Sequence, residues 1–383
     1  MNRDNIQITM DRLSELLEYT APAAPAGQTV PEEQPAGPAP SPEEDLDRCD
    51  RVPGGTNVLL YGVPGCGKSW IIQQEYCGDE DRMERLVFHP DYTYSDFVGQ
   101  ILPDVTPEGQ VRYSFSPGPF PRLLRKAYRD PQREYFLIIE ELNRGSAPAI
   151  FGEVFQLLDR KTAQGADGFP AGTSEYAITN GAVASFVYGD AKHKVRIPSN
   201  LTILGTMNTS DQNAFPLDTA FQRRWELRLV ENSFEGHPYA ASRILDTGVT
   251  WQAFCQAVNR EIVDRGLRMN SAEDKQLGAY FVAGAYLHFD PAEDDPSADA
   301  QKRAAARRSN RRFPEKVLKY LWDDAFRFSR ESAFDLERCT SLEALLRAFT
   351  TARGNRRLDV FQEDLRRAML AAARDAAAPG QGR

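Results

Sequence analysis

The sequence predicts an α/β domain built on a buried parallel sheet, followed by a helix-rich region. From about residue 51, short apolar runs alternate with helical patterns. Runs that are apolar on both faces and separated by helices are typical of a parallel sheet covered by helices. Beyond about residue 235 the pattern is helical and contains no convincing strand. We therefore expect an α/β domain over residues 51–235 and a helical region over residues 236–383.

The expected elements follow one another in the order strand, loop, helix. Asn57–Tyr61 is an apolar strand that ends at Gly62, and the residues from Ser69 to Tyr76 have a helical pattern. Further apolar runs predict strands at 85–88, 135–139 and 201–205. Apolar residues at helical spacing predict helices at 251–265, 314–329, 341–352 and 358–375.

The N-terminal fifty residues differ from the rest of the chain. Residues 1–20 predict a short amphipathic helix, and residues 21–50 are rich in Pro, Ala and Glu and predict an extended, disordered linker. The apolar side chains at near-helical spacing in the first segment are Ile6, Met10, Leu13 and Leu17. A frayed terminus and a docking peptide for a partner are the two interpretations of the helix.

The net charge of −9 argues against a chain coated with basic residues for nucleic-acid binding. The charge is uneven, because residues 1–50 contain eleven acidic residues and three arginines and so carry −8. The overall charge therefore does not exclude a local basic surface on the rest of the chain. The basic run at 302–312 is interpreted as a solvated loop or helix face, with a nucleic-acid or partner contact as the alternative.

The composition predicts a soluble, cytoplasmic chain without a membrane partner. No stretch approaches the roughly 18 uncharged apolar residues of a membrane helix, and the N-terminus lacks the apolar segment of a secretory signal. The five cysteines are scattered and lack the spacing of a disulfide framework or a zinc site, so reduced thiols are expected.

Residues 62–69, GVPGCGKS, fit the pattern G-x-x-x-x-G-K-[ST] after a strand and at the start of a helix. Glycines let the backbone turn tightly around phosphate oxygens, and its N–H groups donate to them. Lys68 is expected to reach the β- and γ-phosphates, and the Ser69 hydroxyl to ligate Mg²⁺. The nucleotide-binding residues predicted from this segment are Gly62, Pro64, Gly65, Cys66, Gly67, Lys68, Ser69 and Trp70.

Two adjacent carboxylates, Glu140 and Glu141, end the apolar strand at 135–139. The carboxyl ends of the strands are where open α/β folds bind ligands. Glu140 is expected to hold the Mg²⁺ through water, and Glu141 to orient and deprotonate the attacking water. The alternative interpretation is a strand end that is simply exposed to solvent. The presence of the glycine-rich segment at 62–69 favours the catalytic role over this alternative.

Further polar groups follow later strands. The strand at 201–205 leads to Asn208, whose amide is suited to holding the lytic water against the γ-phosphate. Arg223 and Arg224 are candidates to supply a neighbouring subunit with a cation that neutralises charge during phosphoryl transfer. The alternatives are a turn residue at 208 and local ion pairs for the arginines.

Several segments together resemble the McrB-type branch of the AAA+ NTPases. The resemblance is dense over residues 51–235 and sparse in the helical region. The segments that carry it are FHPDYTYSDFVG (88–99), SPGPFPRLL (116–124), EELNRGSAPAIFGEVFQLLDR (140–160), TMNTSD (206–211), LDTAFQRRW (217–225) and PEKVLKYLWDD (314–324).

The resemblance implies an AAA+ P-loop NTPase core with a parallel five-stranded sheet, followed by a helical lid. It further implies assembly into a ring, commonly a hexamer, with nucleotide between subunits. The roles it assigns are the P-loop pair for Lys68 and Ser69, the acidic pair for Glu140 and Glu141, the sensor for Asn208 and a finger acting in trans for Arg223 or Arg224.

The best-known members of this branch bind and hydrolyse GTP and drive a partner nuclease that cuts modified DNA. We therefore expect Mg²⁺-dependent hydrolysis of GTP or ATP, a separately encoded nuclease partner, and DNA contact through that partner. Residues 1–50 do not resemble the DNA-reading domain of the restriction members, so recognition of modified DNA is expected elsewhere or not at all. A chaperone-like ATPase that remodels protein complexes is the alternative function.

Residues 161–195 are rich in glycine and turn residues, which predicts an inserted hairpin. A ring would be able to present such a hairpin to its pore; a surface hairpin without a special role is the alternative. The candidate contacts are Tyr176, Tyr188, Lys192, His193 and Lys194.

Overall fold

The computed structural model describes residues 50–105, 107, 109–208, 215–266 and 275–377. The expected N-terminal helix at 1–20 and all but the last residue of the linker at 21–50 lie outside the described residues, as do three residues of the TMNTSD segment, 209–211. Among the described residues, no helix combines the length and the apolar composition that crossing a bilayer requires.

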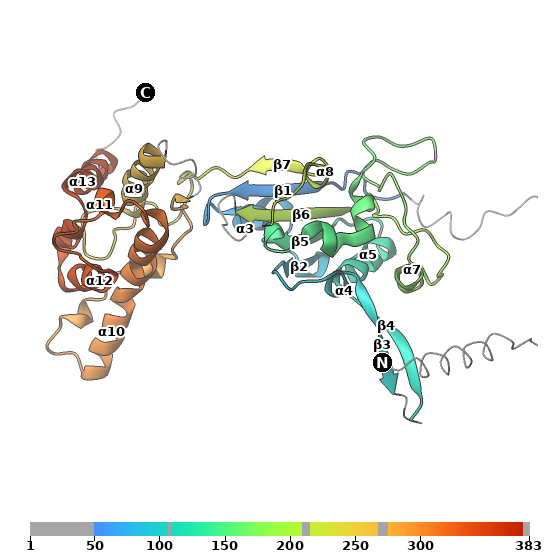
Figure 1. The fold of residues 1–383 in the computed structure, drawn as a ribbon, viewed down its shortest axis with the longest axis horizontal. Helices are drawn as coiled ribbons and strands as arrows, with labels where there is room; N and C mark the ends of the chain where they lie inside the picture. Colours follow the sequence, from blue (N-terminus) through green and yellow to red (C-terminus); the bar gives the residue numbers. More distant parts are fainter. Residues whose placement is uncertain (1–49, 106, 108, 209–214, 267–274, 378–383) are drawn as a thin grey trace, which may run out of the picture. The chain divides into compact units, whose positions relative to one another are not determined.

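A five-stranded parallel sheet forms the centre of the first region, with the strand order β2-β5-β6-β1-β7 (Figure 1). Its strands are β1 (Asn57–Gly62), β2 (Met83–Val87), β5 (Tyr135–Glu140), β6 (Leu201–Asn208) and β7 (Glu226–Leu229). The predicted α/β class and the five-stranded parallel sheet are thus confirmed.

Short helices connect the strands. They are α3 (Lys68–Ile71), which continues as a π-helical turn to Tyr76, α4 (Tyr94–Phe97), α5 (Pro119–Arg129), α6 (Ala147–Phe151), α7 (Gly181–Tyr188) and α8 (Thr219–Gln222). Single 3₁₀ segments lie at Glu80–Arg82, Leu142–Arg144 and Gly152–Leu158.

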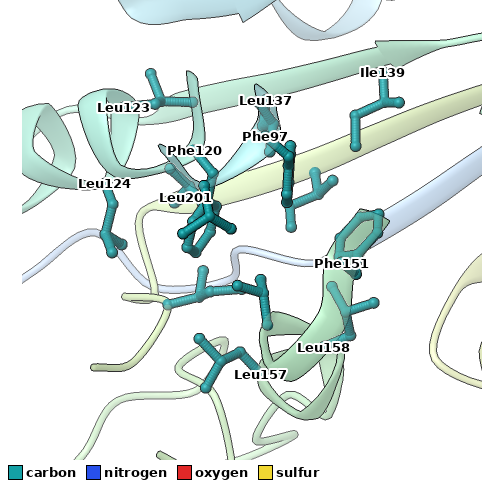
Figure 2. Packing of buried hydrophobic residues seen from close by; sticks show 14 of the residues in the cluster. Phe97, Phe120, Leu123, Leu124, Leu137, Ile139, Phe151, Leu157, Leu158 and Leu201 are labelled. Atoms are coloured by element: carbon teal, nitrogen blue, oxygen red, sulfur yellow. The ribbon is translucent and has the colours of Figure 1, made fainter. Parts of the chain in front are cut away.

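The central strands β1, β5 and β6 are mainly apolar because both of their faces are buried, whereas the edge strands β2 and β7 contain charged and exposed residues. Leu59 and Ile203 pack into a cluster with residues of α5 and α6, whereas their neighbours Leu60 and Leu204 belong to a second cluster on the other face, with Ile72. Side chains alternate between the faces of a strand, so covering both faces requires the continuous apolar runs seen in the sequence. Figure 2 shows the first cluster around strand and helix residues Leu137, Ile139, Leu201, Phe97, Phe120, Leu123, Leu124, Phe151, Leu157 and Leu158.

Parallel pairing brings the carboxyl ends of the central strands to one edge. Gly62 is in register with Asn208, and Ile139 with Gly205 one strand further on. The glycine-rich loop, the acidic pair and Asn208 therefore leave the sheet side by side, as the sequence predicts.

A projecting hairpin lies where the sequence analysis expects none. β3 (Gly99–Val105) and β4 (Val111–Pro117) form an antiparallel pair that extends away from the sheet (Figure 1). The hairpin expected at 161–195 is wrong, because this segment contains helix α7 and only isolated bridges in place of paired strands. Asn180 caps α7 by accepting from the Val183 N–H, so one of the turn-type residues of the segment marks the start of a helix.

The C-terminal region is helical, as predicted. Its helices are α9 (Trp251–Gly266), α10 (Ala300–Phe313) with π-helical turns at Pro314–Leu318 and Leu321–Ala325, α11 (Arg330–Ala333), α12 (Leu342–Thr351) and α13 (Glu363–Ala377). Short 3₁₀ segments lie at Gly284–Tyr286, Pro291–Glu293 and Gly354–Val360. A separate aromatic core around Trp251, Phe254 and Phe313 holds these helices together. The basic run 302–312 lies within α10.

Candidate active site

The glycine-rich loop between β1 and α3 adopts conformations that require glycine. Gly65 and Gly67 have φ angles of 76° and 106°, which place both in the left-handed region. A Cβ on Gly67 would press against the ring of Tyr280 at 3.0 Å. The tight turn ends at Lys68, where α3 begins, so the backbone N–H groups at the start of this helix face the site.

Lys68 lies buried beneath the loop, with 9% of its surface exposed. Its ammonium donates to the carbonyl oxygens of Gly62 and Val63, both at 3.1 Å, and to Oδ1 of Asn208 at 2.8 Å. Burial lowers the pKa of Lys68, and the nearby Cys66 and Glu141 oppose that shift. All described partners of the ammonium are oxygen or sulfur acceptors, so the positive charge of Lys68 is stabilised by the glycine-rich loop and by Asn208 at the end of β6.

Asn208 links this lysine to the acidic pair. Its Oδ1 accepts from Lys68, while its Nδ2 donates to both carboxylate oxygens of Glu141, at 3.0 and 3.1 Å. The two neighbours settle the orientation of the amide, because a cation requires the oxygen and a carboxylate requires the NH₂ group. Asparagine is the residue that satisfies both sides at once.

Glu141 has a left-handed backbone, with φ 55° and ψ 46°, which is uncommon outside glycine and costs of order 1 kcal/mol. Its N–H donates to Thr206 Oγ1 at 3.3 Å, and its carboxylate also accepts from Arg144 Nε at 3.1 Å. This backbone turn directs the Glu141 side chain towards Asn208, although Glu141 directly follows Glu140 at the end of β5.

Glu140 and Ser69 form a second oxygen cluster. The Ser69 hydroxyl donates to Glu140 Oε1 at 3.2 Å, and Arg85 of β2 holds the same oxygen at 2.5 Å. Adjacent ligands of an octahedral Mg²⁺ lie about 3.0 Å apart, so the hydroxyl and the carboxylate fit as neighbouring ligands. No group of three or more His, Cys, Asp or Glu in the described part of the chain could hold a metal alone. One carboxylate and one hydroxyl fit Mg²⁺, which usually keeps several waters and binds substrate phosphates.

Most residues predicted for the glycine-rich loop, the acidic pair and the end of β6 line one cavity of about 450 Å³, whereas the predicted Gly62 and Cys66 do not line it. Those that the sequence analysis singled out are Pro64, Gly65, Gly67, Lys68, Ser69, Trp70, Glu140, Glu141 and Asn208. Four others were missed, namely Thr206, Tyr280, Phe281 and Lys316. The last three come from the helical region, more than 200 residues after the loop. Lys316 lies in the segment 314–324 that carries part of the family resemblance, but a place in the cavity was not predicted for it.

The segment that contains Tyr280 packs directly on the glycine-rich loop. The Tyr280 N–H donates to the Gly65 carbonyl at 2.7 Å, and its ring stacks on Trp70 with centroids 5.9 Å apart. Trp70 remains 47% exposed, so the cavity has a partly open aromatic wall beside the backbone of the glycine-rich loop. Polar groups for phosphates and aromatic surface for a base are the two features that a nucleotide requires.

Lys316 adds a cation from the π-helical turn after α10. Its ammonium lies 5.3 and 5.2 Å from the ring centroids of Phe281 and Tyr286. We expect Lys316→Met to raise the Kd of a nucleoside triphosphate by about 5- to 30-fold, because a partly desolvated charge-assisted contact contributes about 1–2 kcal/mol. Titration with a fluorescent nucleotide measures this change.

Lys319→Met is the matched control, because Lys319 lies on the next turn and is paired with Asp323 at 2.8 Å. Its affinity for nucleotide should equal that of the unaltered chain. Equal affinities for the two variants and the unaltered chain would contradict a nucleotide contact by Lys316.

Arg223 and Arg224 lie away from this cavity. They line another cavity, of about 970 Å³, at the amino end of β1 together with Asn57. Glu226, which begins β7, is in register with Val58, whereas the glycine-rich loop leaves the opposite end of the strand. The length of β1 separates the two places by about 17 Å. The arginines therefore do not join the site formed by their own chain.

The two arginines differ in their surroundings. Arg224 is fixed: it pairs with Asp159 at 2.8 Å, donates to the Ala220 carbonyl at 2.7 Å and lies over the Phe155 ring at 4.1 Å. Arg223 is exposed, and no ion pair or side-chain hydrogen bond involves it among the described residues. Only Arg223 is therefore free to reach a ligand on another molecule.

The side chains proposed for a pore contact at 161–195 are divided. Tyr188 and His193 stack on each other with centroids 3.8 Å apart, and Tyr188 also packs on Tyr128, so both belong to the body of the domain. Tyr176 and Lys192 are exposed, and Lys194 donates to Thr179 at 2.6 Å. Two of the five proposed contacts, Tyr188 and His193, therefore belong to the packed domain, whereas the other three are exposed.

The model of the AAA domain (dynein-related subfamily) matches residues 57–225. This stretch begins with β1 and ends beside Arg224, so it contains the loop, the acidic pair, Asn208 and both arginines. The Type II restriction enzyme BsuMI component YdiS of Bacillus subtilis (strain 168) is 31% identical over 275 residues, which cover 60% of this chain and 74% of that protein.

A second relative is similar over a shorter stretch. The Type IV methyl-directed restriction enzyme EcoKMcrB subunit of Escherichia coli (strain K12) is 27% identical over 184 residues, covering 47% of this chain and 36% of that subunit. Among solved structures, a protein of Cytophaga hutchinsonii aligns over 74% of this chain and 78% of its own length at 14% identity, with a TM-score of 0.27, too low to support an argument about the fold.

Proposed function

The chain belongs to the McrB-like AAA+ proteins of the dynein-related subfamily, and from this premise we propose that it is the Mg²⁺-dependent nucleotide-hydrolysing motor subunit of a restriction system. The observation that carries the catalytic part of the proposal is the continuous contact from Lys68 through Asn208 to Glu141. A phosphate-binding cation and a carboxylate suited to act on water are joined there by one amide.

In the proposed reaction, different residues of the chain bind the triphosphate, activate the attacking water and hold the metal ion. The backbone of the glycine-rich loop and the buried Lys68 bind and orient the triphosphate, and exclude water from one side of it. Glu141 orients the attacking water and takes its proton, and Asn208 holds that carboxylate at a fixed distance from Lys68. Ser69 and Glu140 would hold Mg²⁺, which neutralises phosphate charge when bound.

A neighbouring copy of the chain is proposed to complete the site. Arg223 is exposed at the far end of β1 from its own loop. A ring of AAA+ subunits, commonly a hexamer, would place this guanidinium at the γ-phosphate of the next subunit, where it stabilises the charge of the transition state. Arg224, tied to Asp159, would instead keep this end of the subunit folded.

The role in restriction rests on the relatives. Both are named as components or subunits of restriction enzymes, which supports a separately encoded nuclease as the partner that the motor drives. DNA would be engaged through that partner.

Steady-state release of phosphate from GTP and from ATP tests the proposal. We expect turnover that requires Mg²⁺ and stops when EDTA is added. A preference for GTP would support the restriction motor, whereas a preference for ATP would favour the remodelling ATPase. Absence of both nucleotide binding and turnover would contradict the proposed function.

Action in trans predicts rescue between two inactive variants. Arg223→Ala should lower turnover by about 10³-fold without changing the melting temperature, because its side chain is exposed. Mixing it with Lys68→Ala subunits should restore part of the activity, since some sites then combine an intact loop with an intact Arg223. Absence of restored activity in rings that contain both subunits would contradict the assignment.

Arg224→Ala is the comparison that separates the two arginines. It removes a mostly buried ion pair and should lower stability by about 1–3 kcal/mol, measured as a fall in melting temperature. Equal melting temperatures for the two variants would contradict the difference seen in their surroundings.

A further inference from the structure

One face of α10 carries three arginines for which the described residues provide no carboxylate partner. Arg308, Arg311 and Arg312 are exposed, and none of them forms an ion pair within the described part of the chain. Their spacing of three and four residues makes the side chains neighbours on the helix surface, where like charges repel. Some other arginines of this region have carboxylate partners, as Arg347 has Glu343. The exposed Arg243, Arg327 and Arg356 form no ion pair among the described residues either, but they are widely separated in sequence, whereas the three arginines of α10 are neighbours on one helix face.

The orientation of the helix is fixed by its opposite face. Ala306, Asn310 and Phe313 are buried. Asn310 exchanges two hydrogen bonds with the Asp290 backbone, at 2.7 and 3.0 Å, and donates to Glu293 at 2.7 Å. The helix cannot roll to bring the three arginines to these acids, so they stay directed outward.

The acidic residues near this face do not form ion pairs with the three arginines in the described structure. Glu293 accepts from Asn310 and lies 3.9 Å from Arg307. Glu315, one turn further along, is exposed and forms no ion pair with the three arginines in the described structure. The fold thus tolerates a local positive charge in a chain whose net charge is −9. A polyanion outside the chain would relieve the repulsion between these arginines.

The rest of this face indicates which kind of partner fits. Gln301 and Ala305 are exposed and Ala304 is half-buried, so the surface beside the arginines is small and flat. A protein interface needs an apolar centre, and this face offers no large apolar side chain among residues 301–312. Binding to a nucleic-acid backbone without sequence preference is dominated by cations and needs no apolar centre, and the guanidinium group is well shaped to contact phosphate oxygens in pairs.

We infer that Arg308, Arg311 and Arg312 bind the phosphate backbone of duplex DNA without reading its sequence. This contact belongs to the chain itself and does not depend on nucleotide hydrolysis. It would add affinity for any duplex while a partner supplies recognition. Its salt dependence follows from the number of phosphates that the arginines neutralise.

Fluorescence anisotropy with a labelled duplex of arbitrary sequence tests this inference on the full chain, without nucleotide. We compare the unaltered chain with the triple variant Arg308→Gln, Arg311→Gln and Arg312→Gln over a series of salt concentrations. The slope of log K against log salt should become less steep by about 2.7, that is 0.9 for each of three phosphate contacts. Affinity at low salt should fall by at least about tenfold, while the melting temperature stays the same because the three side chains are exposed.

A second triple variant provides the matched control. Arg338→Gln, Arg347→Gln and Arg367→Gln change the net charge by the same amount, but at exposed arginines that already contact carboxylates. This variant should keep the salt slope of the unaltered chain. Equal losses in both variants would overturn the proposal, since only the overall charge would then matter.

Two further outcomes would also overturn it. One is that the unaltered chain does not bind duplex DNA. The other is that it binds polyglutamate in preference to DNA and loses that binding in the α10 variant, which would identify an acidic protein as the partner. Because no nucleotide is present, a failure here leaves the test of hydrolysis independent.

Discussion

Replacing Glu141 by Gln is expected to lower nucleotide turnover by about 10²- to 10⁴-fold while leaving nucleotide affinity within about twofold. Glutamine keeps the size of the side chain and one acceptor oxygen for Asn208, but it cannot accept a proton from water. The residue contacts Asn208 and Arg144 and does not contact the glycine-rich loop. Binding and hydrolysis should therefore separate in this variant. Phosphate release measures the first effect, and titration with a fluorescent nucleotide measures the second.

Glu134→Gln is the control for this experiment. Glu134 is an exposed carboxylate just before β5, whereas Glu141 follows the other end of the same strand. The two substitutions make the same change in charge and volume, but only one lies in the cavity. Unreduced hydrolysis by Glu141→Gln, or an equal loss in Glu134→Gln, would exclude Glu141 as the base.

Much of the site could be predicted because it follows the ends of strands. The glycine-rich loop, the acidic pair and Asn208 each follow an apolar run that is buried on both faces, and parallel pairing brings these ends together. The local sequence therefore contains both the strand and the polar group that it positions. What the sequence does not contain is the hydrogen bond that Lys68 donates to Asn208, since this depends on the register between β1 and β6.

Other elements had signals that were not used. Residues 111–116 read V-R-Y-S-F-S, a strict alternation that is typical of a strand and belongs to β4. The short edge strand β7 also alternates, although four residues are few for a prediction. In 161–195 the glycines suggested a hairpin, whereas Asn180 and Gly189 mark the two ends of α7.

The contribution of the helical region was not predicted, although Lys316 lies in the segment 314–324 that resembles the family's lid. Tyr280 and Lys316 reach the cavity only because the segment around Gly278 packs against the backbone of Gly65. A Cβ on Gly278 would lie 2.2 Å from the Gly65 carbonyl carbon, so a glycine is required at this contact. Close approach of two backbones far apart in the sequence is a property of the folded chain and cannot be read from either segment alone.

Lys68→Ala is expected to abolish tight nucleotide binding as well as turnover. Removing one partner from a buried charge-assisted contact costs about 2–5 kcal/mol, which corresponds to a rise in Kd of about 30- to 5,000-fold. The ammonium is buried and lies among the carbonyls of Gly62 and Val63, whereas Lys316, the other lysine that lines the cavity, is exposed and lies on the helical region. Titration of the variant with fluorescent GTP and ATP measures the loss.

Two further variants, Lys68→Met and Lys192→Ala, serve as controls for this prediction. Lys68→Met retains most of the side-chain volume, so a loss shared with Lys68→Ala is due to the charge and not to a collapsed loop. Lys192→Ala removes an exposed lysine from the same domain and should bind nucleotide normally. If both Lys68 variants melt at the temperature of the unaltered chain and still bind nucleotide with its affinity, the glycine-rich loop is not the phosphate site. A loss of binding in Lys68→Met beside a loss of turnover alone in Glu141→Gln would divide the Lys68–Asn208–Glu141 contact into a binding end and a catalytic end.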